Sequence, residues 1–229
     1  MHIPDGFLSL QVCILTYIVA IIFWLFGFRG VRRFTDERHI PLLSPFTAMF
    51  FAAQMMNFPI MGGTTAHLLG GPILALVLGP YAGLVSMTVI LLMQALIFGD
   101  GGLTTLGANV LNIGIIGVFI PYIVFKIVIK ISKSRRGMFA GAFLGAFLGD
   151  LLAAVFAGFE LGISVPVFQY GILVAVTSMV IPYSIIGIGE GVVTSFIIAV
   201  LAKSRSDLLE LPKAAPSILG GWSYNKLGV

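Results

Sequence analysis

Long apolar runs follow one another through most of this chain of 229 residues. Residues 39 to 99 include no Asp, Glu, Lys or Arg, and charged residues make up only 10% of the whole sequence. A soluble domain carries roughly 25% charged residues. Because this chain has too few charges to cover a surface in contact with water, it is predicted to be an all-α protein of the lipid bilayer.

The apolar runs predict seven transmembrane helices, since one crossing takes about 20 residues. The runs cover residues 8–28, 42–58, 68–80, 82–98, 106–130, 137–158 and 167–203. The last run is too long for one crossing, and Pro182 is predicted to divide it into a short interfacial or re-entrant piece and a crossing near 184–203. We therefore expect one transmembrane domain, residues 1–203, followed by a cytoplasmic polar tail, residues 204–229.

The orientation in the membrane follows from the placement of Lys and Arg, which favour cytoplasmic loops. Four arginines crowd the loop after the first run, whereas residues 59–71 and 99–105 carry no Lys or Arg. Lys203 and Arg205 end the last helix. This pattern predicts an N-terminus outside and a C-terminus in the cytoplasm. The basic cluster follows the first apolar run instead of preceding it, so no signal peptide is predicted and Met1 is expected to remain in the mature protein.

Two of the three histidines, His2 and His67, fall on the outer side of this topology, whereas His39 lies in a basic cytoplasmic loop and is expected to be solvated. The α-amine of Met1, the deprotonated amide nitrogen of His2 and its imidazole can chelate one ion in two fused rings. An imidazole nitrogen from His67 would complete a square plane, which suits Ni(II) or Cu(II). The alternative is that both histidines bind only water. Cys13 is the single cysteine, so no Cys-based site is expected.

Three segments of the sequence resemble one known family. They are Met-His-Ile-Pro-Asp-Gly-Phe-Leu-Ser at residues 1–9, Ala-His-Leu-Leu-Gly-Gly at 66–71, and the run from Gln94 to Asn109. They look like the substrate-binding (S) component of energy-coupling-factor (ECF) nickel and cobalt transporters, the NikM/CbiM family. The likeness covers roughly residues 1–203. The Pro-Asp-Gly opening and the His-Leu-Leu-Gly-Gly loop resemble the nickel branch more than the cobalt branch, and cobalt stays open.

The resemblance implies a ligand set, an architecture and partners. The metal ligands would be Met1, His2 and His67, and the fold would be a six-helix S-component core with one additional N-terminal helix. The protein would be a multi-pass protein of a prokaryotic plasma membrane. It would work with a transmembrane T component, two ATPase subunits and a small accessory membrane subunit, and no nucleic acid is expected as a partner. Ala48 and Ala52 on the second helix would dock the T component through a close helix contact, with ordinary internal packing as the open alternative.

Several acidic or polar residues are candidates for supporting roles. Asp5, Thr64 and Asp100 lie on the outer side and could orient a ligand imidazole. Asp150 and Glu190 fall inside predicted helices, where a buried acid is costly and indicates a function. A proton relay and a hydrogen bond to a neighbouring helix are both open for these two acids, and the hydrogen bond is favoured.

Three kinds of function compete. The absence of a phosphate-binding loop from the sequence predicts that this chain is not an enzyme and that ATP hydrolysis belongs to partners of the ABC type. A self-sufficient cation channel or secondary transporter would need acids along a path and an inverted repeat, and the repeat is not evident. An intramembrane metalloenzyme would need a His-Glu-x-x-His helix or a similar cluster, which the sequence lacks. Ni(II) uptake, with Co(II) as the alternative substrate, is therefore the favoured hypothesis.

Overall fold

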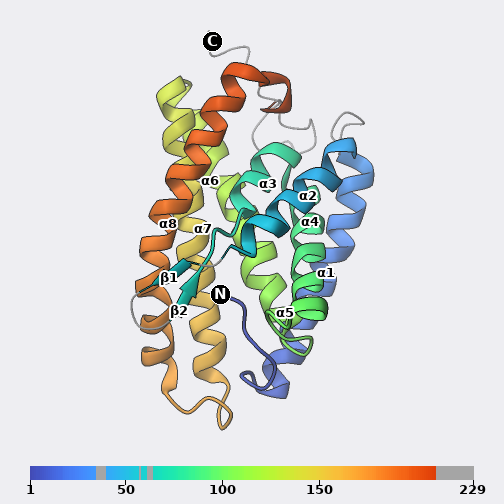
Figure 1. Ribbon diagram of the computed structural model, residues 1–229, viewed down its shortest axis with the longest axis vertical. Helices are drawn as coiled ribbons and strands as arrows, with labels where there is room; N and C mark the ends of the chain where they lie inside the picture. The colour runs from blue at the N-terminus through green and yellow to red at the C-terminus, as the bar shows by residue number, and fades with distance from the viewer. Residues whose placement is uncertain (35–39, 57, 61–63, 210–229) are drawn as a thin grey trace.

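The computed structural model of the chain describes residues 1–34, 40–56, 58–60 and 64–209, and its helices form one elongated bundle (Figure 1). Within the described residues, five helical segments are long and apolar enough to cross a membrane. They are Leu10–Arg33, Pro80–Phe98, Leu106–Ser132, Arg135–Ile163 and Gly171–Ser204. The prediction of a helical membrane protein is confirmed.

The chain order of the elements agrees with the predicted succession of helices. The helices and strands are α1 (Leu10–Phe34), α2 (Ile40–Gln54), β1 (Phe58–Ile60), β2 (Thr64–Ala66), α3 (Gly71–Leu78), α4 (Pro80–Met93), α5 (Leu106–Asn109), α6 (Gly117–Ser132), α7 (Arg135–Ile163) and α8 (Gly171–Ser204). Two π-helical stretches, η1 (Gln94–Phe98) and η2 (Val110–Ile116), extend α4 and join α5 to α6, and a 3-10 turn, η3 (Ser206–Leu209), follows α8. The antiparallel hairpin of β1 and β2 was not predicted.

Two of the predicted crossings are short helices in the structure. α2 has 15 residues and α3 has only 8, and every residue of α3 is buried. At a rise of 1.5 Å per residue, α3 extends about 12 Å, well short of a bilayer of about 30 Å. Proline and glycine bound it on both sides, with Pro72 at its start and Gly79 before Pro80 at its end. The count of seven crossings stays a prediction.

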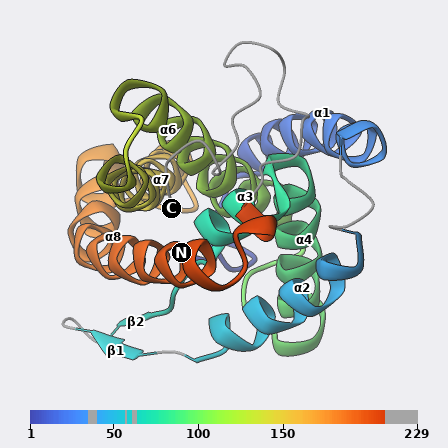
Figure 2. The same cartoon turned by 90° about the horizontal axis from the view of Figure 1, so that it is seen from above.

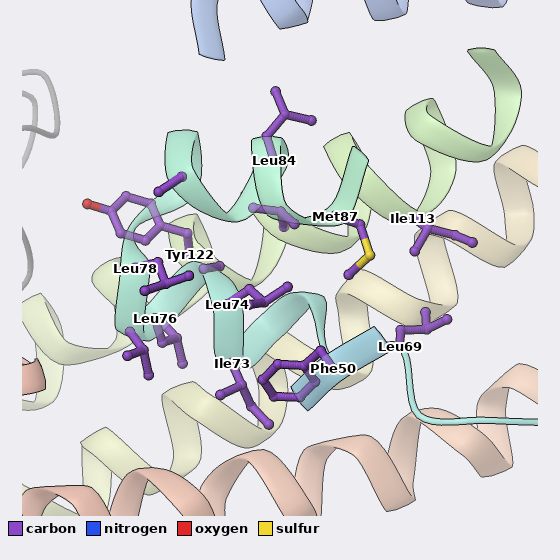
Figure 3. Packing of buried hydrophobic residues seen from close by; sticks show 14 of the residues in the cluster. Phe50, Leu69, Ile73, Leu74, Leu76, Leu78, Leu84, Met87, Ile113 and Tyr122 are labelled. Atoms are coloured by element: carbon purple, nitrogen blue, oxygen red, sulfur yellow. The ribbon is translucent and has the colours of Figure 1, made fainter. Parts of the chain in front are cut away.

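The hydrophobic core is built around α3, which lies between α4 and α6 (Figures 2 and 3). Leu74 on α3, Met87 on α4 and Ile113 on η2 are all fully buried in one cluster (Figure 3). Backbones approach closely here, because a Cβ at Gly71 would lie 2.5 Å from the carbonyl oxygen of Gly117 at the start of α6. A helix packed this tightly provides a rigid platform for the loop that precedes it.

Gly141, Gly145 and Gly149 form a stripe of small residues on α7 that faces α6. A Cβ at Gly145 would lie 2.8 Å from the Pro121 carbonyl oxygen, and one at Gly149 would lie 2.7 Å from Pro121 Cγ. Gly141 approaches Phe125 in the same way, with a Cβ position 3.3 Å from its ring. Small residues on a membrane helix allow such close helix contacts, so this stripe serves packing between α6 and α7.

The prediction that Pro182 divides the last helix is wrong. α8 runs without interruption for 34 residues, with Pro182 inside it. α8 packs along α7, and glycines of α7 let the backbones meet, since a Cβ at Gly158 would lie 2.6 Å from Val176 Cα and one at Gly162 2.4 Å from Ile172 Cα. Proline is tolerated inside membrane helices when neighbouring helices support the chain. Tertiary packing therefore outweighs the local preference of proline for a helix end.

The N-terminus lies inside the bundle rather than at one end of it. In Figure 1 the segment before α1 rises from the lower end of the bundle to its middle, whereas α8 ends near the opposite end of the bundle. Viewed from above, the N-terminus lies within the outline of the bundle beside α8 (Figure 2). Residues 210–229 of the predicted tail lie outside the described residues.

Candidate metal site

The backbone of Ile3 is held by α5 and by the loop between η1 and α5. The Ile3 amide donates to Asn109 Oδ1 at 2.8 Å, and Asn109 Nδ2 donates back to the Ile3 carbonyl at 3.1 Å. The same carbonyl accepts from the Thr105 hydroxyl at 2.5 Å and from the Gly102 amide at 3.0 Å. Every backbone polar group of this buried residue is thus satisfied, as burial requires. These bonds fix the path of the N-terminal segment.

Asp5 adds a second attachment to the same loop. Its carboxylate accepts from the amides of Leu103 and Thr104, at 3.1 and 2.7 Å, and from the Thr104 hydroxyl. The hydroxyl bond, followed by the amide bonds, holds the pKa of the Asp5 carboxyl below its usual range. Gly102 permits the contact, because a Cβ there would lie 2.1 Å from Asp5 Oδ1. Asp5 therefore anchors the segment, and its predicted action on a ligand imidazole stays a prediction.

The amine of Met1 is buried beside α8, where it donates a hydrogen bond to the Tyr183 hydroxyl. Burial lowers the pKa of this amine to about 5, against a partial opposing effect of Asp100. The same burial raises the pKa of the Asp100 carboxyl, which the Met1 charge opposes. At neutral pH the amine is therefore uncharged and carries a free electron pair, as metal ligation requires.

The structure brings together His2, in the N-terminal segment, and His67, in the loop before α3. Their ring centroids lie 4.9 Å apart, with the ring planes inclined by 39°. Burial lowers the pKa of His67 to about 4 and lowers the pKa of His2 well below its usual value, and the Met1 charge acts in the same direction on both. Both imidazoles are therefore neutral at pH 7 and can act as ligands.

Three imidazole nitrogens in this cluster lack a hydrogen-bond partner among the residues that the structure describes. They are His2 Nδ1, His2 Nε2 and His67 Nε2, all of them buried. His67 Nδ1 is 3.1 Å from the Leu68 carbonyl oxygen, which makes Nδ1 the protonated nitrogen and leaves the electron pair on Nε2. Unpartnered buried polar atoms cost about 1–3 kcal/mol each. Such atoms beside a neutral amine are arranged to bind a ligand that accepts nitrogen electron pairs.

A cavity of about 300 Å³ borders this cluster. Met1 and His2 form one side of it, and Phe168, Met179 and Pro182 line the side formed by α8 and the turn before it. Its walls are mostly apolar, so an ion in the cavity would meet few polar groups other than those of the cluster. The amine and His2 therefore border a space large enough for a small ion.

The segment after His67 is held by buried side chains from two helices. The amides of Leu69 and Gly70 donate to the Glu190 carboxylate of α8, at 2.9 and 2.8 Å. The Leu69 carbonyl accepts from Gln54 Nε2 of α2 at 2.5 Å. The hydrogen bond favoured for Glu190 is therefore present, although its partner is a backbone segment rather than a helix.

The other predicted site residues are not part of the cluster. The side chain of Thr64 lies outside what the structure describes. Ala48 and Ala52 are exposed on α2. Asp150 is fully buried on α7, and neither of its carboxylate oxygens has a hydrogen-bond partner within the described residues, so the hydrogen bond favoured for it is not found.

Sequence reasoning missed the residues that hold the ligands in place. Asn109 and Thr105 belong to a segment that resembles the family, but no role was predicted for either of them. Tyr183 and Gln54 were not identified as candidates. A usable signal was present, because buried polar side chains in apolar runs are costly and therefore indicate a specific partner. The partner itself could not be read, since Gln54 and Tyr183 meet residues far away in the sequence.

Comparisons with known proteins identify the family. A family model described as "Cobalt uptake substrate-specific transmembrane region" (CbiM) matches residues 2–208. The chain is 42% identical over 219 residues to a putative fused nickel transport protein NikMN of Archaeoglobus fulgidus, a match of 96% of this chain and 71% of the relative. It is 37% identical to the fused nickel transport protein NikMN of Rhodobacter capsulatus, over 95% of this chain and 66% of the relative. Both fused relatives thus extend beyond the matched part.

A cobalt relative and two solved structures agree with this result. The cobalt transport protein CbiM of Thermosipho melanesiensis is 31% identical over 92% of this chain and 90% of its own length. A truncated transition metal transporter of known structure superposes with a TM-score of 0.81 at 33% identity, covering 89% of this chain and 99% of the other. The S component of a bacterial ECF transporter shares the fold at a TM-score of 0.51 and 18% identity, over 76% of this chain and 98% of the other. The chain therefore belongs to the CbiM family and is a membrane protein of nickel or cobalt transport.

Proposed function

We propose that this protein captures one Ni(II) ion as the substrate-specific subunit of an ATP-driven ECF uptake transporter. One observation supports the proposal: the Met1 amine lies buried close to imidazole nitrogens of His2 and His67 that have no hydrogen-bond partner among the described residues. The ligands are the Met1 amine, the deprotonated amide nitrogen and imidazole of His2, and Nε2 of His67. The amine and amide close a five-membered chelate ring, and the amide and imidazole Nδ1 close a six-membered ring.

The donor set favours nickel. Four nitrogens in a plane suit Ni(II) or Cu(II) and disfavour zinc, magnesium and calcium. The two relatives with 42% and 37% identity are both named as nickel transport proteins. Co(II) is the second candidate substrate, supported by the family description and by the cobalt relative.

The proposal extends to the membrane topology and the partners. The chain is taken to cross the plasma membrane of a prokaryote seven times, with the N-terminus outside and the C-terminus inside. Residues 1–203 form the S component and residues 204–229 a cytoplasmic tail. An S-component fold without a phosphate-binding loop needs a T component and two ATPase subunits to supply energy. A small accessory membrane subunit is also proposed as a partner, in keeping with two relatives that are named as fused transport proteins and extend beyond the matched part.

The T component is proposed to dock on α2. Ala48 and Ala52 are exposed there, one helical turn apart, which allows close approach of a second helix. Ala48 also lines a groove of about 450 Å³ between α2 and α4, together with Phe51, Val89 and Met93.

The test is a titration of the purified protein with Ni(II) and then Co(II), followed by visible absorption and metal stoichiometry. The wild type is expected to form a yellow, diamagnetic complex of one ion per chain. His67→Ala should lose this spectrum, and one residue added before Met1 should abolish tight binding while the protein stays folded. His39→Ala serves as the control, because His39 lies in a loop predicted to be on the opposite side of the membrane, and it should bind as wild type.

The result also decides between the alternatives. A tighter, cobalt-specific complex at the same ligands would assign Co(II) as the substrate. Binding that ignores both His67→Ala and the added residue would refute the chelate and favour a self-sufficient channel or secondary transporter.

A further inference from the structure

Glu190 stands out among the buried acids of the membrane helices because both of its carboxylate oxygens are bound by the segment that carries His67. Oε2 accepts from the Leu69 amide at 2.9 Å, and Oε1 accepts from the Gly70 amide at 2.8 Å. The side chain is 1% exposed, on the inner face of α8. Two consecutive amides therefore converge on one carboxylate, as in the backbone nests that bind anions.

The local backbone is built to make this contact. Gly70 has φ +71°, a left-handed conformation that points its amide and that of Leu69 toward the same group. A Cβ at Gly70 would lie 2.2 Å from Phe50 Cδ1, so packing also requires glycine there. Gly70 is the N-cap of α3, and the N-terminus of a helix favours a negative charge. These contributions offset the cost of burying a carboxylate within the bundle.

The opposite side of the same segment is also held. Gln54 Nε2 donates to the Leu69 carbonyl at 2.5 Å, and Gln94 Nε2 donates to Gln54 Oε1 at 2.9 Å. Gln54 and Gln94 are both fully buried. The Leu69 backbone is therefore fixed between α8 and α2, with little freedom to shift.

This arrangement orients the imidazole of His67. The ring is directed by the contact between Nδ1 and the Leu68 carbonyl, which leaves Nε2 free beside His2. The Leu68 carbonyl belongs to the same peptide unit as the Leu69 amide that Glu190 binds. A shift of that peptide would therefore rotate the imidazole and move Nε2 away from His2.

We propose that Glu190 is a positioning residue for the fourth metal ligand, acting through the backbone of Leu68 and Leu69 on His67. The inference rests on the proposed metal site. Groups that orient a metal ligand typically change metal affinity by about 10- to 100-fold when mutated. Glu190 is then needed for metal capture although it is not a ligand.

The test compares Glu190→Gln with Glu160→Gln. Glu160 is a matched control, since it is also a buried acid of a membrane helix, and its Oε2 accepts from Asn112 Nδ2 at 2.7 Å rather than from the His67 segment. In Glu190→Gln, an amide NH2 group would face a backbone amide, so one of the two bonds is lost. Ni(II) affinity is measured by isothermal titration, and ligation is read from the position of the visible absorption band.

Glu190→Gln is expected to bind Ni(II) about 10- to 100-fold more weakly, with the band shifted toward that of His67→Ala. Glu160→Gln should keep the wild-type affinity and band. If Glu190→Gln does not fold, Glu190→Asp replaces it, since it keeps the charge but is one methylene shorter, and an intermediate affinity with the same band shift is expected.

Two sets of results separate the possible failures. A wild-type protein that does not bind Ni(II) or Co(II) refutes the proposed function itself. A wild type that binds through His67, with a Glu190→Gln or Glu190→Asp variant of unchanged affinity and spectrum, refutes only the role of Glu190. Equal losses in Glu160→Gln and Glu190→Gln would also refute it, because the effect would then be a general consequence of removing a buried charge.

Discussion

Replacing Asn109 by Ala should release the N-terminal segment from the bundle without unfolding the bundle itself. The Asn109 side chain makes both a donor and an acceptor contact with the backbone of Ile3, at 3.1 and 2.8 Å. The loss of these two hydrogen bonds affects the Ile3 carbonyl and the Ile3 amide differently. The Ile3 carbonyl keeps the Thr105 hydroxyl and the Gly102 amide as donors, whereas Asn109 is the acceptor that the structure gives the Ile3 amide.

The free-energy cost of Asn109→Ala therefore comes mainly from the Ile3 amide that is left without an acceptor. An unsatisfied buried amide costs about 1–3 kcal/mol, and Ile3 is only 2% exposed. A cost of this size multiplies the population of the undocked segment by about 5 to 150. Thr105→Val removes one of three donors to the Ile3 carbonyl and leaves no amide unpaired, so its cost should stay below about 1 kcal/mol.

The assay is acylation of the Met1 amine by an N-hydroxysuccinimide ester, followed by mass spectrometry of the metal-free protein. Because the amine is buried against Tyr183, it must leave the bundle to react, and the rate measures the undocked population. Asn109→Ala should react about 5 to 150 times faster than the wild type, and Thr105→Val less than about 5 times faster. The exposed Lys203 reports reagent activity in every sample. Equal rates for Asn109→Ala and wild type would refute the reasoning.

Three further predictions concern the loop glycines and Asp5. Gly102→Ala should accelerate acylation of Met1, because the new Cβ would lie 2.1 Å from Asp5 Oδ1 and 2.4 Å from the Asp5 nitrogen; an unchanged rate would contradict this. Gly70→Ala should lower the free energy of unfolding by about 1–2 kcal/mol for its φ of +71° and by about 1–3 kcal/mol for the clash with Phe50. Gly99 has φ +64° and open space around an added Cβ, so Gly99→Ala should lower the free energy of unfolding only by the cost of the left-handed conformation. Thermal unfolding of the two variants measures the difference. The lowered pKa of Asp5 means that its contribution to docking is present above the ordinary carboxyl pKa and is lost as pH falls through the lowered pKa. Hydrogen exchange of residues 1–9, corrected for intrinsic rates, should therefore accelerate in that acidic range in the wild type and show no such step in Asp5→Asn.

The helical pattern was largely predictable because it depends on local composition. Apolar runs placed a helix at each of seven positions, and the break between the runs at 68–80 and 82–98 falls close to the boundary of α3 and α4 at Gly79 and Pro80. Pro182 shows where the local rule fails, since α8 continues through it while packed on the glycines of α7. The length of α3 was also unpredictable, because a short helix enclosed by others and a short crossing share the same apolar composition.

The candidate ligands could be named from the sequence, whereas the residues that hold them could not. Met1 and His2 are adjacent, so their chelating nitrogens are within reach of one another in any fold that leaves the amine free. The position of His67 beside His2, at 4.9 Å between ring centroids, depends on a loop and an N-terminal segment meeting inside the bundle. Asn109, Tyr183 and Glu190 act across separations of 106, 182 and at least 120 residues.

The sequence by itself determined that the protein belongs in a lipid bilayer, the order of its helices and the candidate nitrogen donors of Met1 and His2, because each is set by composition or by neighbouring residues. Only the tertiary structure decided that the N-terminus enters the bundle, that α8 passes through a proline unbroken, and that Glu190 binds the segment carrying His67. The physical reason is that these features depend on hydrogen bonds and packing between distant segments, whose energies exceed local preferences only after the helices have assembled.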